Sequence, residues 1–275
     1  MGDAVRLNAY FERIGFAGSI APTLETLEAL HALQPAALPF ENLDFLLGVP
    51  IRLDQANLER KLIDERRGGF CAELNLLLLR VLLELGFEAR AHLATALFGS
   101  PRGADAAPDH LLLSVDIAGT TWLADAGFGG LIQAAPLKFR PALEQETSLG
   151  TYRVSGDGPG YELQFRREGD WWPVYRFTLD PAGESEAGEL AKSLMREPHG
   201  FLREHLLVER AGPGGRVRLF DTRLNTESGE GREERFLDSV GEIRDTLAGV
   251  FGIAPPAEGL DPILGRLLTR SMAAG

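Results

Sequence analysis

The sequence predicts a multi-domain protein of the α+β class, and three observations support this. Apolar residues recur at helical spacing through the first 86 residues, the period shifts toward two from Phe87, and helical and strand-like stretches are mixed beyond residue 188. Helices that precede a run of strands, instead of alternating with them, are typical of separate α and β units. We therefore expect three domains, over residues 1–86, 87–188 and 189–275.

The N-terminal domain is expected to be helical. Leucines at every third residue predict an amphipathic helix over Leu24–Leu33, with Thr23 as its N-cap and Pro35 just past its end. Asp54 is placed to cap a second helix. A third helix is expected over Cys71–Leu85, and because this stretch is apolar nearly all round, it should be buried.

Alternating residues predict a β-domain with antiparallel hairpins in the middle third. The expected strands are Phe87–Leu93, Leu111–Ile117, Thr120–Ala124, Tyr161–Arg166 and Trp172–Leu179. The Gly/Glu/Ala-rich stretch Pro181–Gly188 is expected to be a linker or an exposed loop. The C-terminal domain is expected to contain a helix, a strand and a second helix, at Glu189–Arg210, Arg216–Thr222 and Ser239–Val250.

Composition and charge restrict the classes of function. The chain has 275 residues, 44% hydrophobic and 25% charged, as in average globular proteins. Forty acidic residues against 28 basic ones give a formal net charge of −12, which disfavours nucleic acid and anionic membranes as partners. The single cysteine excludes an internal disulfide. The N-terminal segment lacks the apolar core of a signal peptide, so we expect a cytoplasmic protein.

The common sequence motifs of several site classes are missing. The chain contains no GxGxxG, GxxxxGK[ST], HExxH or GxSxG pattern and no EF-hand loop. Nucleotide, zinc-protease, serine-hydrolase and calcium sites of these kinds therefore have no support, and we expect no metal.

The single cysteine, Cys71, is a candidate nucleophile. It follows Gly68-Gly69-Phe70 and stands at the start of an expected helix. Backbone N–H groups and the positive end of the helix dipole at such a position favour a thiolate, as do nearby cationic side chains. The alternative is that Cys71 is a small, buried hydrophobic residue, as lone cysteines beside Leu-rich sequence usually are.

A thiolate nucleophile needs an imidazole base and a group that orients it. His110 opens an expected strand, and Asp125 ends the strand that pairs with it through a turn at Ala118-Gly119. The start of the first strand and the end of the second lie side by side in such a hairpin. We therefore expect His110 and Asp125 to be a base and its orienting carboxylate.

The other histidines have simpler interpretations. His31 is expected at the solvent edge of its helix, His92 on the surface of its strand, and both His199 and His205 on an exposed helix. Near the cysteine, Glu73 and Asn75 are expected to be structural, through hydrogen bonds to neighbouring loops.

Several ordered motifs make the sequence similar to the arylamine N-acetyltransferases. Arg67–Asn75 resembles the RGGxCxELN signature of that family, Asp109–Leu113 its histidine-initiated strand, and Asp125–Gly129 its D[VA]GFG block. Upstream, Tyr10–Gly15, Thr23–Leu27 and Pro39–Asp44 also resemble family blocks, so the resemblance covers roughly residues 5 to 135. Two segments depart from the family pattern, Ala94–Leu97 and Ala191–Phe201 in the C-terminal part.

The resemblance implies a fold and a reaction. It implies an N-terminal helical bundle, a central antiparallel β-barrel and a C-terminal α/β lid around a catalytic core like that of cysteine proteases and transglutaminases. It implies a triad of Cys71, His110 and Asp125 that transfers acetyl from acetyl-CoA to an arylamine, arylhydrazine or N-hydroxyarylamine. Backbone N–H groups of Cys71 and of residues around Gly127 are expected to hold the oxyanion.

Further residues are assigned with this reaction in mind. Aromatic walls for a flat amine are expected from Phe128, Phe40 and Phe70, although core packing is the alternative for each. Gly129 and Gly130 are expected to contact acetyl-CoA. Arg67 and Glu41 are expected to pair and to support the nucleophile loop. We expect a monomer or a homodimer.

Three alternatives remain open. The same triad would suit an amide synthase that closes a macrolactam from a carrier-bound polyketide. The departure of the C-terminal part from the family pattern favours this hypothesis. A thiol hydrolase of the protease or transglutaminase kind shares the Cys-His-Asp geometry. A non-catalytic scaffold would hold Cys71 inert.

Overall fold

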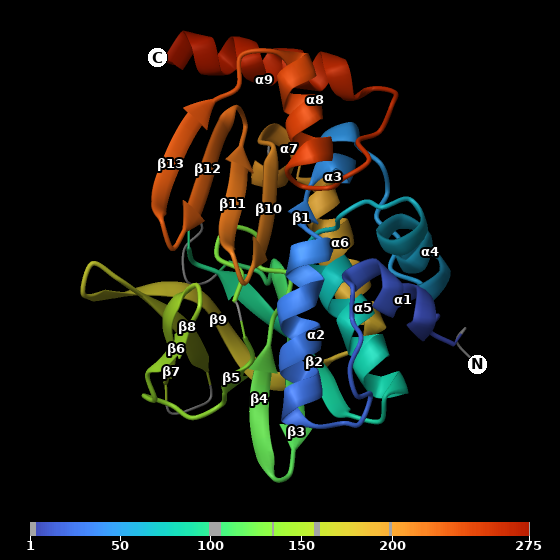
Figure 1. Cartoon of the computed structure of the whole chain (residues 1–275), viewed down its shortest axis with the longest axis vertical. Helices are drawn as coiled ribbons and strands as arrows, with labels where there is room; N and C mark the ends of the chain where they lie inside the picture. The colour runs from blue at the N-terminus through green and yellow to red at the C-terminus, as the bar shows by residue number, and fades with distance from the viewer. Residues whose placement is uncertain (1–3, 99–105, 134, 157–159, 198–199, 275) are drawn as a thin grey trace.

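Helices and two antiparallel sheets make up the fold (Figure 1). The structure is a computed structural model and describes residues 4–98, 106–133, 135–156, 160–197 and 200–274. One sheet has eight strands and curls into a nearly closed barrel, and the other has five. The predicted α+β class, with a helical N-terminal part, a β-barrel and a C-terminal lid, is confirmed.

The N-terminal part is built around one buried helix. Its helices are α1 (Leu7–Ile14), α2 (Leu24–Ala37), α3 (Leu43–Leu47), α4 (Gln55–Glu59), the π-helical turn η1 (Arg60–Asp64) and α5 (Cys71–Glu84). As expected, α5 is buried, since it packs against two strands of the barrel on one side and the other helices on the other. Thr23 caps α2, but the helix continues through Pro35, because a proline in the last turn removes only one backbone hydrogen bond.

The barrel strands follow the order β5-β4-β3-β2-β9-β8-β7-β6. Their bounds are β2 (Glu88–Ala96), β3 (His110–Ile117), β4 (Thr120–Ala124), β5 (Leu137–Lys138), β6 (Gln145–Thr147), β7 (Gly150–Ser155), β8 (Tyr161–Arg167) and β9 (Asp170–Ala182). The predicted hairpin turn is present: Ala118 and Gly119 both have positive φ, and Ile117 pairs with Thr120.

The second sheet forms the lid. Strands β10 (Leu207–Gly212), β11 (Gly215–Phe220), β12 (Arg223–Ser228) and β13 (Gly231–Phe236) form a meander, and β1 (Phe40–Glu41) joins its edge beside β10. Helices α8 (Val240–Gly249) and α9 (Leu260–Ala274) pack with α3 and the sheet around a second apolar core. In Figure 1 these elements form the upper part of the molecule, above the barrel.

Between barrel and lid, two expectations were wrong. Residues 181–188 are not a linker: β9 extends to Ala182, and α6 (Glu184–Arg196) begins two residues later, with Ala187, Leu190 and Leu194 buried. The expected helix over Glu189–Arg210 is divided into α6, the short α7 (Phe201–Glu204) and strand β10. The division into domains at residues 86 and 188 stays a prediction, and α6 spans the second of these positions.

None of the helices in the described part of the chain is long and apolar enough to cross a membrane.

Candidate active site

Three distant segments bring Cys71, His110 and Asp125 together. Cys71 is the first residue of α5, His110 is the first of β3, and Asp125 follows the last residue of β4. His110 Nε2 lies 2.7 Å from Asp125 Oδ2, and both side chains are buried. Cys71 is 5% exposed, and its Sγ lies 3.8 Å from the carbonyl oxygen of Asp109, the residue before the histidine.

The electrostatics of the group favour an ion pair. Burial lowers the pKa of His110, but the charge of Asp125, its hydrogen bond and the contact with Cys71 outweigh burial and raise this pKa to about 10. Burial would raise the pKa of Asp125, but His110 and hydrogen bonds from Asn75 and Gly127 lower it. Because Asp125 occupies Nε2, Nδ1 is the imidazole nitrogen left for the thiol. At neutral pH the imidazole is therefore protonated.

Asn75 fixes the carboxylate from the same helix as the nucleophile. Four residues after Cys71, it shares one face of α5 with it. Its Nδ2 donates to Asp125 Oδ1 over 2.9 Å and to the Leu111 carbonyl over 2.6 Å, and its Oδ1 accepts from Ala126 N–H over 3.0 Å. Asn75 thus makes the loop contacts expected of it, and one of them is to the carboxylate itself.

The backbone of the aspartate loop is already engaged. The N–H of Asp125 donates to His31, that of Ala126 to Asn75, and that of Gly127 to Asp125 Oδ1. The Gly127 N–H binds the carboxylate of the site, so the expected oxyanion donors around Gly127 do not include this group. The N–H of Cys71, at the start of α5, stays the predicted oxyanion donor.

His31 is buried, and the expectation of a solvent-edge residue was wrong. The side chain is 0% exposed, and Nε2 accepts the 3.0 Å hydrogen bond from Asp125 N–H. Burial lowers the pKa of His31 to about 4, so the imidazole is neutral with its proton on Nδ1. The available signal was spacing: His31 lies four residues after Leu27 and thus on the buried face of α2.

The other histidines lie away from this group. His92 is buried, not on the surface as expected, because it lies on the face of β2 that points into the barrel, where its cross-strand partner is Leu112 of the barrel core. Its Nε2 lies 2.7 Å from Ser114 Oγ and its Nδ1 3.0 Å from the Asp180 carbonyl. His205 follows α7 and pairs with Asp221 at 2.8 Å, so it is half-buried and not on an exposed helix. His199 lies outside the described residues.

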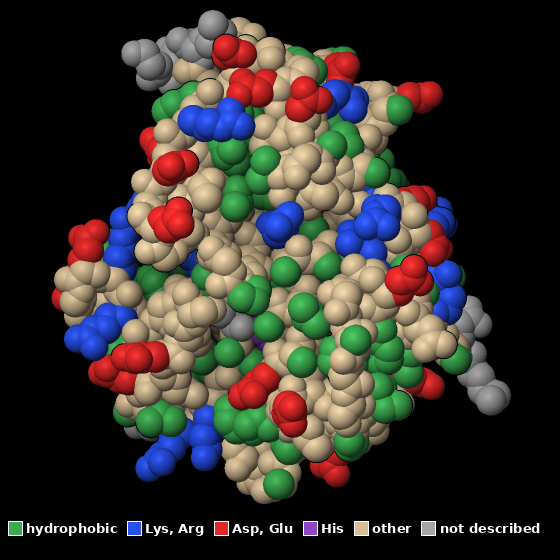
Figure 2. Space-filling view, viewed as in Figure 1, with side chains coloured by type: hydrophobic (Ala, Val, Ile, Leu, Met, Phe, Trp, Pro, Cys, Tyr) green, Lys and Arg blue, Asp and Glu red, His purple; other side chains and the backbone are tan. Residues whose placement is uncertain are grey.

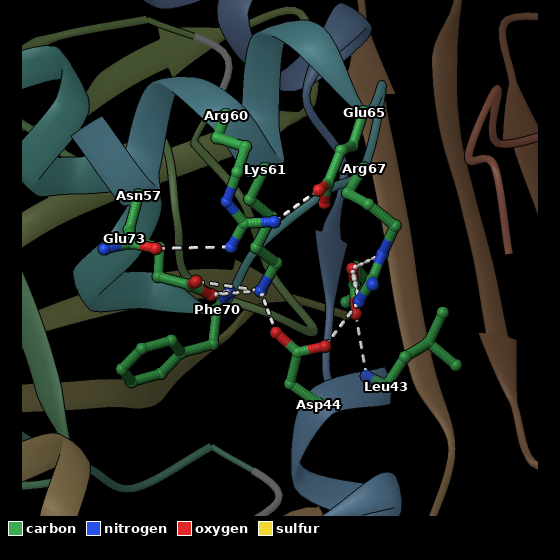
Figure 3. A network of polar contacts seen from close by, with 10 residues as sticks. Leu43, Asp44, Asn57, Arg60, Lys61, Glu65, Arg67, Phe70 and Glu73 are labelled. Atoms are coloured by element: carbon green, nitrogen blue, oxygen red, sulfur yellow. Dashed lines mark hydrogen bonds and ion pairs between the residues drawn. The ribbon is translucent and has the colours of Figure 1, made fainter. Parts of the chain in front are cut away.

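A buried ionic network holds the segment before the nucleophile (Figure 3). Arg67 Nη2 lies 2.6 Å from Glu41 Oε1 and 2.8 Å from Asp44 Oδ1, and Glu41 also accepts from Leu43 N–H. The pair of Arg67 and Glu41 was expected, but Asp44 as a second partner was not. Burial lowers the pKa of Arg67, and the two carboxylates more than reverse this, so the guanidinium stays charged.

Lys61 continues the network to the start of α5. Its Nζ lies 2.7 Å from Asp44 and 2.7 Å from Glu73, and Glu73 Oε2 accepts from Phe70 N–H over 3.0 Å. Glu73 thus ties the residue before Cys71 to the network. Sequence reasoning missed Lys61, because a charged residue in a polar run is usually solvated.

Two glycines allow backbone segments of the site to lie close to each other. A Cβ at Gly68 would lie 2.2 Å from the Pro39 carbonyl oxygen. A Cβ at Gly127 would lie 3.0 Å from the Cα and carbonyl oxygen of Cys71. The aspartate loop therefore touches the start of α5 at a point where a side chain on residue 127 would be crowded.

Aromatic residues surround the imidazole. Phe128 meets the His110 ring edge-on with centroids 4.9 Å apart, and Tyr175 lies 5.0 Å away on β9. Phe40 closes over Gly129, where a Cβ would lie 2.5 Å from its ring. Phe70 instead packs edge-on against Phe45 in the helical core. Tyr175 was missed, because its strand pattern did not distinguish it from other barrel residues.

In the described ranges, no three His, Cys, Asp or Glu side chains are grouped so that they could hold a metal ion.

Comparison with known proteins places the chain among acyltransferases. A family model described as N-acetyltransferase matches residues 23–258. The arylamine N-acetyltransferase of Escherichia coli (strain K12) is 37% identical over 251 residues, which cover 90% of this chain and 88% of that protein.

Solved structures agree. The arylamine N-acetyltransferase (NAT) from Salmonella typhimurium superposes with a TM-score of 0.90 at 32% identity, covering 98% of this chain and 100% of that one. The arylamine N-acetyltransferase of Mycobacterium marinum in complex with CoA gives a TM-score of 0.86 at 31% identity and covers 96% of this chain and 97% of that one.

Proposed function

The chain belongs to the arylamine N-acetyltransferase family, and from this premise we propose that it transfers acetyl from acetyl-CoA to an arylamine, an arylhydrazine or an N-hydroxyarylamine through Cys71. The observation that carries the proposal is the 2.7 Å contact of His110 with Asp125 beside the cysteine at the start of α5. Cytoplasmic location and the monomeric or homodimeric state stay predictions.

The first half-reaction acetylates the cysteine. The Cys71 sulfur, held as a thiolate beside the His110 imidazolium, attacks the thioester carbonyl. The bond from that carbon to the sulfur of CoA then breaks, His110 gives its proton to this sulfur, and CoA leaves as the thiol, which leaves the imidazole neutral. The N–H of Cys71 and the dipole of α5 are suited to the charge that develops on the carbonyl oxygen.

The second half-reaction passes the acetyl group to the amine. The amine nitrogen attacks the acetyl-cysteine carbonyl, the bond to Sγ breaks, and His110 accepts the proton lost by the nitrogen. Asp125 keeps the imidazole in one orientation and stabilises its charge. Phe128, beside the imidazole, is suited to pack against a flat aromatic amine, as is Phe40 next to Gly129, while the core position of Phe70 favours its packing role.

Mass spectrometry of the intact protein tests the proposal. Acetyl-CoA alone should add about 42 Da to Cys71, the mass of an acetyl group that a covalent intermediate carries. The adduct should disappear when an aromatic amine is added, with acetylated amine as product. Cys71→Ala, as control, should give no adduct. An unmodified Cys71 after prolonged incubation with acetyl-CoA would contradict the assignment.

Further assays separate the alternatives. A thiol hydrolase would turn over peptides without CoA. An amide synthase would take its acyl group from a carrier protein and leave small acyl-CoA thioesters intact. A scaffold would leave Cys71 no more reactive toward iodoacetamide at pH ~6 than free cysteine, whose pKa is ~8.5.

A further inference from the structure

A pocket of about 310 Å³ lies where the lid sheet faces the β8–β9 turn, beside the loop that carries Asp125. Five arginines and two glutamates line it, a formal excess of three positive charges in a chain of net charge −12. Figure 2 shows Lys and Arg side chains along this left flank of the molecule. The arginines are Arg166, Arg167, Arg216, Arg218 and Arg232.

These arginines differ in how their charge is balanced. Arg216 is buried, and its Nε lies 3.1 Å from Glu209. Arg166 and Arg167 are exposed on β8 and lie near Glu144 and Glu168, at 3.2 and 3.6 Å. For Arg218 and Arg232, no carboxylate of the described chain lies within ion-pair distance.

Arg218 is the arginine whose charge is least balanced. It is half-buried on β11, and its Nη1 donates to the Gly130 carbonyl over 3.3 Å. Its other N–H groups have no acceptor among the described residues, so they can serve a ligand. Burial lowers its pKa, and Arg223, Arg216 and Arg232 lower it further, against Glu209. A guanidinium nevertheless stays protonated, so a planar cation faces the pocket beside other cations.

An anion with several oxygen atoms would balance the excess positive charge of the pocket. Guanidinium groups bind phosphate oxygens in pairs, and partial burial strengthens such charge-assisted hydrogen bonds. Gly130, which lines the pocket and binds Arg218, comes five residues after Asp125. A ligand with its phosphates in this pocket therefore lies beside the loop that carries the triad aspartate.

We propose that Arg218, with Arg232 beside it, binds the phosphate groups of the acyl-CoA cosubstrate. The proposal rests on the proposed function, which supplies a substrate whose phosphates lie at the end of the molecule opposite the thioester. It gives Arg218 and Arg232 a role in binding the donor, with no part in the chemistry at Cys71.

Donor thioesters with and without phosphates test this. Cys71 acetylation is measured with acetyl-CoA and with acetyl-pantetheine, which has no phosphate, in the full chain and in Arg218→Gln and Arg232→Gln. Arg218→Gln should raise the KM for acetyl-CoA about tenfold, the effect of losing one charged hydrogen bond, with kcat within twofold and acetyl-pantetheine unaffected. The exposed Arg232→Gln should give a smaller rise of the same kind.

Arg235→Gln is the matched control, because Arg235 lies on the same strand as Arg232, pairs with Glu242 and does not line the pocket. Equal effects on both donors, or no effect on either, would overturn the proposal. So would inhibition by inorganic phosphate that depends on Arg218 while the KM for acetyl-CoA does not, since the pocket would then serve another phosphate. Failure of the proposed function looks different: neither donor would acetylate Cys71 in the unmodified chain.

Discussion

One hydrogen bond joins His31 to the backbone of Asp125: the Asp125 N–H donates to His31 Nε2 over 3.0 Å. Helix α2 thereby holds the loop of the triad aspartate, as α5 does through Asn75. The bond requires a neutral imidazole, because a protonated one has no lone pair to accept with. Within the described residues, the buried Nδ1 of His31 has no hydrogen-bond partner.

This neutrality predicts a dependence of stability on pH. The pKa of His31 is about 4 in the folded protein, below the ordinary 6.5, so the unfolded chain binds the extra proton first. The stabilisation is present above pH 6.5 and is lost as the pH falls toward 4. From pH 7 to pH 5 this group should lower the free energy of unfolding by about 2 kcal/mol.

Urea unfolding of the unmodified chain and His31→Asn at both pH values measures this. The free energy of unfolding should differ less between pH 7 and pH 5 in His31→Asn than in the unmodified chain, by about 2 kcal/mol. Equal pH dependence in both proteins would show that His31 is not held neutral.

Removing the carboxylate of the triad should abolish most acyl transfer. Asp125→Asn removes the charge that raises the pKa of His110 to about 10, and kcat/KM should fall roughly 10³- to 10⁴-fold, as in other triads. With Asp125 present, the His110 imidazolium should persist across pH 6–9, which NMR of the imidazole nitrogens would show. In Asp125→Asn the His110 imidazole should lose its proton at lower pH; the same protonation profile in both proteins would contradict the ion pair of His110 and Asp125.

The ionic network predicts a coupled loss of stability. Arg67→Met leaves Glu41 buried without its cation and Asp44 with Lys61 alone, and should cost about 3–5 kcal/mol. A charge swap of Arg67 with Glu41 would not restore the site, because Arg67→Glu places a further carboxylate next to Asp44. A double-mutant cycle of Arg67→Met with Glu41→Gln should recover part of the loss. Additive effects of the two substitutions would mean that the residues do not interact.

The close approach at Gly127 predicts a loss of activity that exceeds the loss of stability. Gly127→Ala places a Cβ 3.0 Å from the backbone of Cys71, so the aspartate loop must move away from α5. We expect the rate of Cys71 acetylation to fall at least tenfold, since a small misplacement of catalytic groups costs about two orders of magnitude. Gly188→Ala, on α6 with open space around it, should leave activity unchanged and raise stability by about 0.5–1 kcal/mol. Full activity in Gly127→Ala would refute the argument.

The sequence specified features that depend on local rules. The juxtaposition of His110 and Asp125 followed from one hairpin whose turn has two positive φ angles, so its register could be read from neighbouring residues. The burial of Lys61 depends on segments distant in sequence, which periodicity cannot place, whereas the spacing of His31 from Leu27 did carry a signal for its burial. Strand β13 was missed because its residues are charged and exposed on both faces, so no apolar alternation marks it.

The two-residue strand β1 connects the lid sheet to the segment before the nucleophile through backbone hydrogen bonds on both of its sides. Phe40 and Glu41 pair with β10 on one side, and on the other Glu41 N–H donates to the Gly69 carbonyl, two residues before Cys71. A chain truncated after α6 would strip β1 of its lid partner and uncover the buried Glu41. Such a truncation should therefore impair the thiol chemistry itself, even though every member of the triad lies within the part retained.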